Sequence, residues 1–93
     1  MIDKIINYEE GEMSEAEEIE FMQELVNSGQ AWQLQGSYGR AAMDMLEAGL
    51  IMLGEKSVTD YYGNRIPSRS EIDPGSMGSP EYVAKKSRES VNA

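Results

Sequence analysis

The stretch AWQLQGSYGRAA, residues 31–42, gathers the residue types that most often build binding or catalytic sites. The spacing of Gly36 and Gly39 invites comparison with a phosphate-cradling loop. Such loops also need a lysine, a longer glycine spacing and a preceding strand, all missing here, so we interpret the glycines as a bend between helical pieces. The polar and aromatic side chains of the stretch are Trp32, Gln33, Gln35, Tyr38 and Arg40.

Catalytic chemistry is narrowly limited by composition, because the chain has no cysteine and no histidine. Disulfides, thiol catalysis, imidazole general-base chemistry and the usual zinc sites are therefore excluded. The acidic run from Glu9 to Glu24 lacks a calcium-loop pattern, and its carboxylates fall on the polar face of an expected helix, where nothing raises a pKa. We expect no enzymatic activity, no cofactor and no metal site.

Trp32 has two interpretations. Tryptophan, tyrosine and arginine dominate the energetics of protein interfaces. A small core also gains more burial from one tryptophan than from any other side chain. We favour the core for Trp32 and take Gln33, Gln35 and Arg40, which a small core does not require, as candidate partner contacts.

Charge is concentrated in the first third of the chain. The net charge is −9, and residues 1–30 hold nine acidic residues against Lys4. Such a face repels nucleic acid phosphates and anionic membranes and attracts basic protein surfaces, so we expect no direct binding to nucleic acid or membrane. This acidic face is either a solvated helix face or a docking face for a partner. The sequence does not decide whether the protein associates with itself. The candidate partner contacts on this face are Glu15, Glu18 and Glu20.

The first 53 residues are expected to form an all-α domain of three to four helices. A first helix is predicted over 2–10, and a second over 14–27, where SEAE has the capping-box pattern. The next segment is either one helix over 30–48 or a short turn, a break at QGS and a helix from Tyr38 to Gly49. We favour the break, because glycine disfavours helix interiors and serine is a good N-cap.

We interpret residues 54–93 as an extended arm that becomes ordered when it binds a partner. The segment holds all three prolines and too few apolar residues for a second core. A short hairpin over 58–66, around Gly63 and Asn64, and a short helix over 80–89 are possible within it. Its candidate docking anchors are Tyr61, Tyr62, Arg65 and Tyr82.

Residues 1–51 resemble a group of small uncharacterised proteins of tailed bacteriophages. The most specific part of the resemblance is WQLQGSYGR, residues 32–40. The resemblance implies a phage origin and a small helical fold, and it implies no activity. The tail from Gly54 lies outside it.

Together these features favour a non-enzymatic accessory protein that binds a larger host or phage protein through its acidic helices and its arm. The alternative is a structural virion component, such as a minor capsid, cement or tail-associated protein, whose arm orders on assembly. The longest apolar run, LIML at 50–53, is far shorter than the roughly 20 residues of a membrane span. The chain start lacks the pattern of a signal peptide. We therefore expect the cytoplasm of an infected bacterium, or the virion under the alternative.

Overall fold

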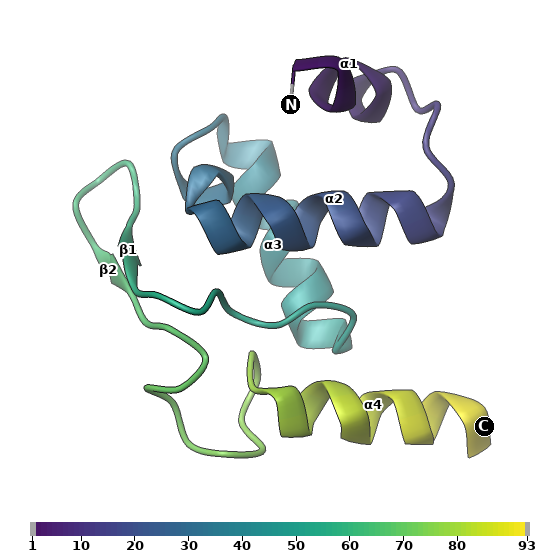
Figure 1. Ribbon diagram of the computed structural model, residues 1–93, viewed down its shortest axis with the longest axis vertical. Helices are drawn as coiled ribbons and strands as arrows, with labels where there is room; N and C mark the ends of the chain where they lie inside the picture. Colours follow the sequence, from purple (N-terminus) through teal and green to yellow (C-terminus); the bar gives the residue numbers. More distant parts are fainter. Residues whose placement is uncertain (1, 93) are drawn as a thin grey trace.

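A computed structural model describes the backbone of residues 2–92 and the side chains of residues 4–89. The described chain is mostly helical, with one small two-stranded sheet (Figure 1). No helix in this described part is both long and apolar enough to cross a membrane. The elements are α1 (Ile2–Glu9), α2 (Glu15–Ser28), the 3-10 helix η1 (Gln30–Trp32), α3 (Gly36–Ala48), β1 (Val58–Thr59), β2 (Arg65–Ile66) and α4 (Pro80–Asn92).

Helix α2 forms the centre of the fold, and its predicted capping box is confirmed. The Ser14 hydroxyl accepts a hydrogen bond from the Glu17 amide at 3.2 Å, and the Glu17 carboxylate accepts one from the Ser14 amide at 3.1 Å. This second bond stabilises the charged carboxylate and lowers the pKa of Glu17. The helix ends at Gly29, whose φ of 85° suits a left-handed C-cap.

The predicted break between a short turn after Gly29 and the following helix is confirmed, since η1 and α3 are separate, but the helix begins earlier than predicted. Helix α3 starts at Gly36 instead of Tyr38, and Gln35 takes the N-cap position predicted for Ser37. The Tyr38 amide already donates to the Gln35 carbonyl at 2.9 Å, so the helical turn begins before Ser37. Gly39 lies beside η1, where a Cβ atom would make only ordinary contacts, at 3.7 Å from the Ala31 carbonyl oxygen and 3.9 Å from the Trp32 ring.

The core lies between α2, α3 and the segment that follows α3. Every core side chain is less than a tenth exposed, which is the condition for the full hydrophobic gain. The buried apolar residues are Phe21, Met22, Leu25, Val26, Ala31, Tyr38, Ala42, Leu46, Ile51 and Leu53.

Helix α1 is fastened to this core through aromatic rings and two polar contacts. The Tyr8 ring lies 5.4 Å from the Phe21 ring and 5.6 Å from the Tyr38 ring, measured between centroids. The Tyr38 hydroxyl donates to the Glu9 carboxylate at 2.6 Å. Lys4 forms an ion pair with Glu24 at 3.0 Å. A buried tyrosine therefore joins α1 to α3.

That tyrosine predicts a loss of stability in strong alkali. Burial disfavours the phenolate, and the hydrogen bond to Glu9 favours the phenol, so the pKa of Tyr38 rises from 10.0 to about 12. Because the folded state holds this proton more tightly, the contribution is complete below pH about 10 and is lost as the pH rises toward about 12. Urea unfolding across this range, followed by circular dichroism, should show the loss.

The Tyr38→Phe variant is the control for this prediction, since it keeps the ring and removes the titrating hydroxyl. Its free energy of unfolding should depend less on pH between about 10 and 12 than that of the natural chain. Equal pH dependence in both proteins would show that Tyr38 does not contribute.

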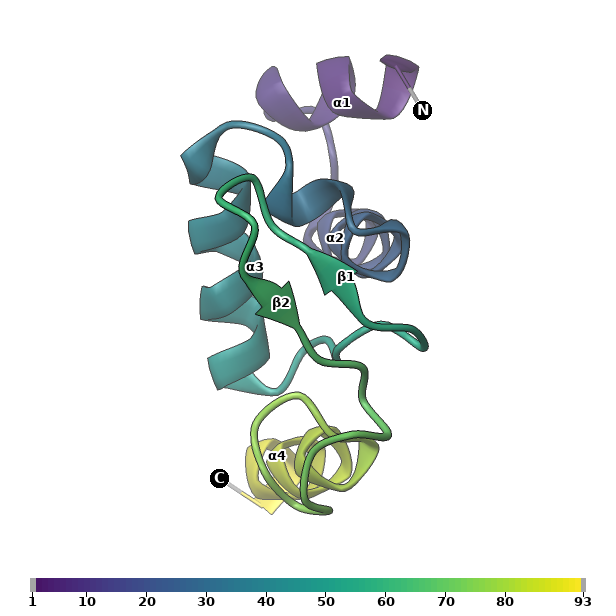
Figure 2. The same cartoon turned by 90° about the vertical axis from the view of Figure 1, so that its left-hand side faces the viewer.

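Residues 54–92 lie against the helices and form a hairpin and a helix. Strands β1 and β2 pair antiparallel, with Val58 opposite Ile66. Helix α4 begins at Pro80, where the Ser79 hydroxyl accepts from the Tyr82 amide at 3.1 Å. Figure 2 shows the hairpin beside α2 and α3, with α1 and α4 at opposite ends of the molecule.

Hydrogen bonds from the chain's own polar groups hold this segment in place. The Arg69 Nε donates to the Leu53 carbonyl at 2.8 Å, and the Tyr82 hydroxyl donates to the Glu47 carbonyl at 2.6 Å. The Leu53 amide donates to the Gly78 carbonyl at 2.9 Å. In this structure the segment is therefore ordered by contacts within the chain. The division into residues 1–53 and residues 54–93, with its partner-ordered arm, stays a prediction.

Candidate functional site

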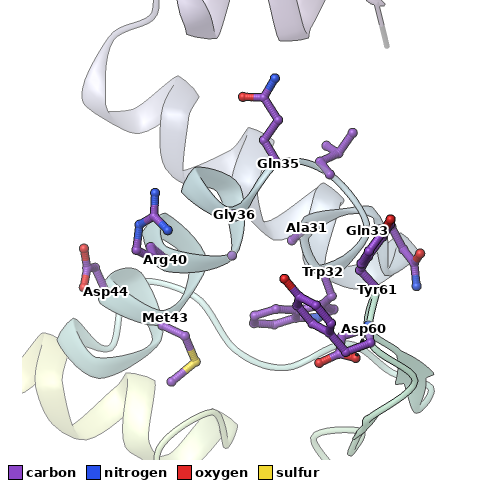
Figure 3. A pocket seen from close by; sticks show the side chains of 13 residues that line it. Ala31, Trp32, Gln33, Gln35, Gly36, Arg40, Met43, Asp44, Asp60 and Tyr61 are labelled. Carbon is purple, nitrogen blue, oxygen red and sulfur yellow. Dashed lines mark hydrogen bonds between the residues drawn. The ribbon is translucent and has the colours of Figure 1, made fainter.

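A groove of about 720 Å³ lies where η1, the start of α3 and the loop of the hairpin meet (Figure 3). Trp32 and Tyr61 stand on one side of it, and Arg40, Met43 and Asp44 of α3 on the other. Most of its wall is apolar or aromatic, with a few charged groups among them. This mixture is typical of binding sites.

Trp32 is placed by the sharp turn after α2. Its amide donates to the Gly29 carbonyl at 3.2 Å, which winds the chain into η1. The half-buried indole packs against the core and also lines the groove. Its Nε1 is buried, and no acceptor for it lies among the described residues. Trp32 therefore contacts both the core and the groove.

The hairpin loop closes the groove because η1 holds it. The Gln33 side-chain amide donates to the Thr59 carbonyl, and the Tyr61 amide donates to the Trp32 carbonyl at 3.0 Å. The Asp60 carboxylate shapes the turn by accepting from the backbone amides of Tyr62 at 2.9 Å and of Asn64 at 2.8 Å. Tyr61 and Tyr62 are consequently presented at the rim.

The wall formed by α3 carries opposite charges one turn apart. The Arg40 guanidinium lies over the first turn of the helix, 3.1 Å from the position that a Cβ atom on Gly36 would take. Arg40 and Asp44 are exposed, and neither forms an ion pair among the residues whose side chains the structure describes. Both charges are therefore open to a ligand.

The groove offers aromatic, apolar, amide and charged side chains for contact. Among the residues that the structure describes, its lining includes no cysteine, serine or lysine. Across the described residues, no three acidic side chains are grouped so that they could hold a metal ion. What the arrangement can do chemically is bind, through aromatic faces, a methionine, carboxylates and a guanidinium.

The groove unites half of the candidate contacts predicted from sequence and leaves the others elsewhere. Glu15, Glu18 and Glu20 lie on α2, and Tyr82 lies on α4, where its hydroxyl donates to the Glu47 carbonyl near the C-terminal end of α3. Figure 3 shows the Gln35 side chain pointing away from the groove centre. The predicted residues that line the groove are Gln33, Gln35, Arg40, Tyr61 and Tyr62.

Arg65 is engaged within the chain. It forms an ion pair with Glu71, whose carboxylate also accepts from the Ser68 amide at 3.0 Å. These contacts favour the charged carboxylate and lower the pKa of Glu71 to about 2. The pair fixes the chain just after β2, so Arg65 has a structural contact in this conformation.

Among the groove residues that sequence reasoning did not predict as contacts are Met43, Asp44 and Asp60. Met43 has an apolar side chain that pattern alone would assign to a core, yet it is 39 % exposed. Asp60 carried a usable signal, because an aspartate just before a turn that contains glycine and asparagine often accepts from the turn's amides. Asp44 joins the groove only through tertiary packing.

Comparison with known proteins identifies one family. A model described as a domain of unknown function (DUF7417) matches residues 1–66. No curated protein and no solved structure matches the chain. The match continues past residue 51, where the resemblance was expected to end, to the last residue of β2, and so it includes every residue that lines the groove.

Proposed function

The chain belongs to the family of domains of unknown function described as DUF7417, and from its groove we propose that it is a non-enzymatic protein-binding domain. Its partner is a larger protein, which it modulates by docking. The groove is the main docking surface, and the acidic face of α2 and residues 54–93 extend it. The observation that carries this proposal is the aromatic rim of the groove.

The rim supports the proposal because its two tyrosine rings are largely exposed to solvent and take no part in the core. Tyr61 is 73 % exposed and Tyr62 is 84 % exposed. Their rings form an edge-to-face pair with centroids 5.3 Å apart. Large exposed aromatic side chains beside a groove are typical of interface hot spots, where tyrosine and tryptophan contribute most.

The acidic face of α2 supports a protein partner with a basic surface. Glu15 and Glu20 are exposed, and Glu18 is partly exposed, on the helix that carries much of the acidic excess of residues 1–30. Charge of one sign raises the rate of association with an oppositely charged partner. Nucleic acid, which is also negative, is a poor candidate for this face.

The origin of the protein is a further part of the proposal. On the motif at residues 32–40, the chain comes from a tailed bacteriophage and acts in the cytoplasm of the infected bacterium on a host or phage protein. If the chain is instead a virion component, mass spectrometry of purified particles will find it at a fixed copy number. If the protein is absent from purified particles, the result supports the accessory role.

Site-specific photo-crosslinking in infected cells tests the binding surface. A photoreactive amino acid replaces Tyr62 at the groove rim, and in a control chain it replaces Asn7, an exposed residue of α1 outside the proposed docking surface. We expect one defined crosslinked protein from position 62 and little from position 7. The double variant Tyr61→Ser with Tyr62→Ser should lose most of the partner on capture.

Two results would contradict the proposal. One is equal crosslinking from both positions, which indicates random encounters. The other is a double variant that captures the same protein as the natural chain in equal amount, since the rim would then contribute nothing. Circular dichroism of the double variant provides the folding control, because both side chains are exposed and their loss should leave the core intact.

A further inference from the structure

We propose that the groove receives an arginine side chain from a short segment of the partner protein. This inference rests on the proposed protein-binding function and names the chemistry that the groove recognises. It follows from three features of the groove: its aromatic faces, its carboxylates and the buried indole nitrogen.

The aromatic faces are the first feature. Trp32, Tyr61 and Tyr62 supply three rings to one groove, two of them at its exposed rim. An aromatic ring attracts a cation placed over its face, and a guanidinium also stacks flat against it. Met43, on the opposite wall, offers an apolar contact to the methylene stem of such a side chain.

The carboxylates are the second feature. Asp44 on α3 and Asp60 on the hairpin lie on opposite walls. Asp60 is held in position by the turn amides, and Asp44 has no ion pair among the described side chains. Two carboxylates against Arg40 leave an excess of negative charge, within a chain whose net charge is −9. A planar guanidinium is the cation that best fits both a ring and a carboxylate.

The indole nitrogen of Trp32 is the third feature. It can donate a hydrogen bond to the backbone of the bound partner segment. Among the described residues, Trp32 Nε1 is a buried donor without an acceptor, an arrangement that is costly in a folded protein. The hairpin loop is held to this region by the bonds from Gln33 to the Thr59 carbonyl and from the Tyr61 amide to the Trp32 carbonyl. Because the nitrogen is buried, binding in this mode requires that the segment displace this loop, so that a peptide carbonyl beside the arginine accepts from the indole.

Peptide titrations of the full chain, followed by amide and indole resonances in NMR, test this inference. The probes are acetyl-Leu-Arg-Leu-amide and the same peptide with citrulline, which keeps the shape of arginine and removes its charge. We expect the arginine peptide to shift the Trp32 indole resonance and to bind about tenfold more tightly than the citrulline peptide.

Two matched variants locate the charge effect. Asp44→Asn removes a carboxylate within the groove, and Glu55→Gln removes an exposed carboxylate outside it. Asp44→Asn should weaken binding of the arginine peptide several-fold, and Glu55→Gln should change it little. If both variants weaken binding equally, the attraction is general, and the groove does not recognise arginine.

Other outcomes also decide against the inference. Equal binding of the two peptides shows that the groove selects apolar side chains only, and an absence of shifts at the indole shows that it binds neither. A uridine oligomer that shifts the same resonances more strongly than the arginine peptide identifies nucleic acid as the occupant. In the first two cases the crosslink from position 62 still stands, so this inference and the protein-binding proposal fail separately.

Discussion

Replacing Phe21 with alanine is expected to lower the free energy of unfolding by about 3–5 kcal/mol, the usual cost of truncating a buried aromatic side chain. Phe21 is 2 % exposed, and its ring contacts the Tyr8 ring that holds α1. A chain of this size is stable by only about 5–15 kcal/mol in total. Urea unfolding should show the midpoint falling by at least about 1 M.

Ile6→Ala is the control for this core prediction. Ile6 lies on α1 and is 45 % exposed, so its truncation removes little buried surface. It should cost less than about 1 kcal/mol. If Phe21→Ala costs no more than Ile6→Ala, then Phe21 does not fill the core that the structure assigns to it.

Replacing Gly49 with alanine is expected to detach α4 from the helices. Gly49 has a φ of 74°, which costs a residue with a side chain about 1–2 kcal/mol. In addition, a Cβ atom there would lie 2.5 Å from the Cβ and Cγ atoms of Lys86 on α4. Because non-bonded carbon atoms do not approach so closely, α4 must move. Hydrogen exchange should show that the amides of residues 82–89 lose protection.

Gly63→Ala separates the two costs. Gly63 has a φ of 86°, but a Cβ atom there would meet nothing within 4 Å. The Gly63→Ala variant introduces the backbone strain without a steric clash, so the protection of the α4 amides should stay unchanged. If both variants leave α4 equally protected, the packing of α4 on Gly49 is not a significant contact.

Local chemistry made the helical part of the fold predictable. The Ser14–Glu17 capping box and the glycines at 29 and 49 are signals carried by a few neighbouring residues, and each marks a helix end in the structure. The start of α3 was misplaced by two residues. The serine N-cap signal at Ser37 is not used, because the turn begins earlier, with the Tyr38 amide donating to the Gln35 carbonyl at 2.9 Å.

The placement of residues 54–92 was harder to predict, because polar contacts determine it. A count of apolar residues finds too little burial for a second core. It overlooks hydrogen bonds such as those from Arg69 and Tyr82 to backbone carbonyls of the helices. Single side chains that satisfy distant backbone groups leave no periodic pattern in a sequence.

The candidate site was half predictable for the same reason. Residue type pointed to Gln33 and Arg40 as residues that a core does not need. It pointed to Tyr61 and Tyr62 as docking anchors of the arm, and all four line one groove. Their meeting depends on the hairpin lying beside η1. Asp44 lines the groove only because the hairpin is placed there, so the sequence alone could not identify it.

The position of Trp32 has a practical consequence. The chain has one tryptophan, and it lines the groove beside two tyrosines at the rim. Any indole fluorescence of the intact protein therefore originates at this one place. A change in emission wavelength or in quenching reports on the occupancy of the groove, with no label attached. The protein thus carries a natural optical probe in the wall of the groove.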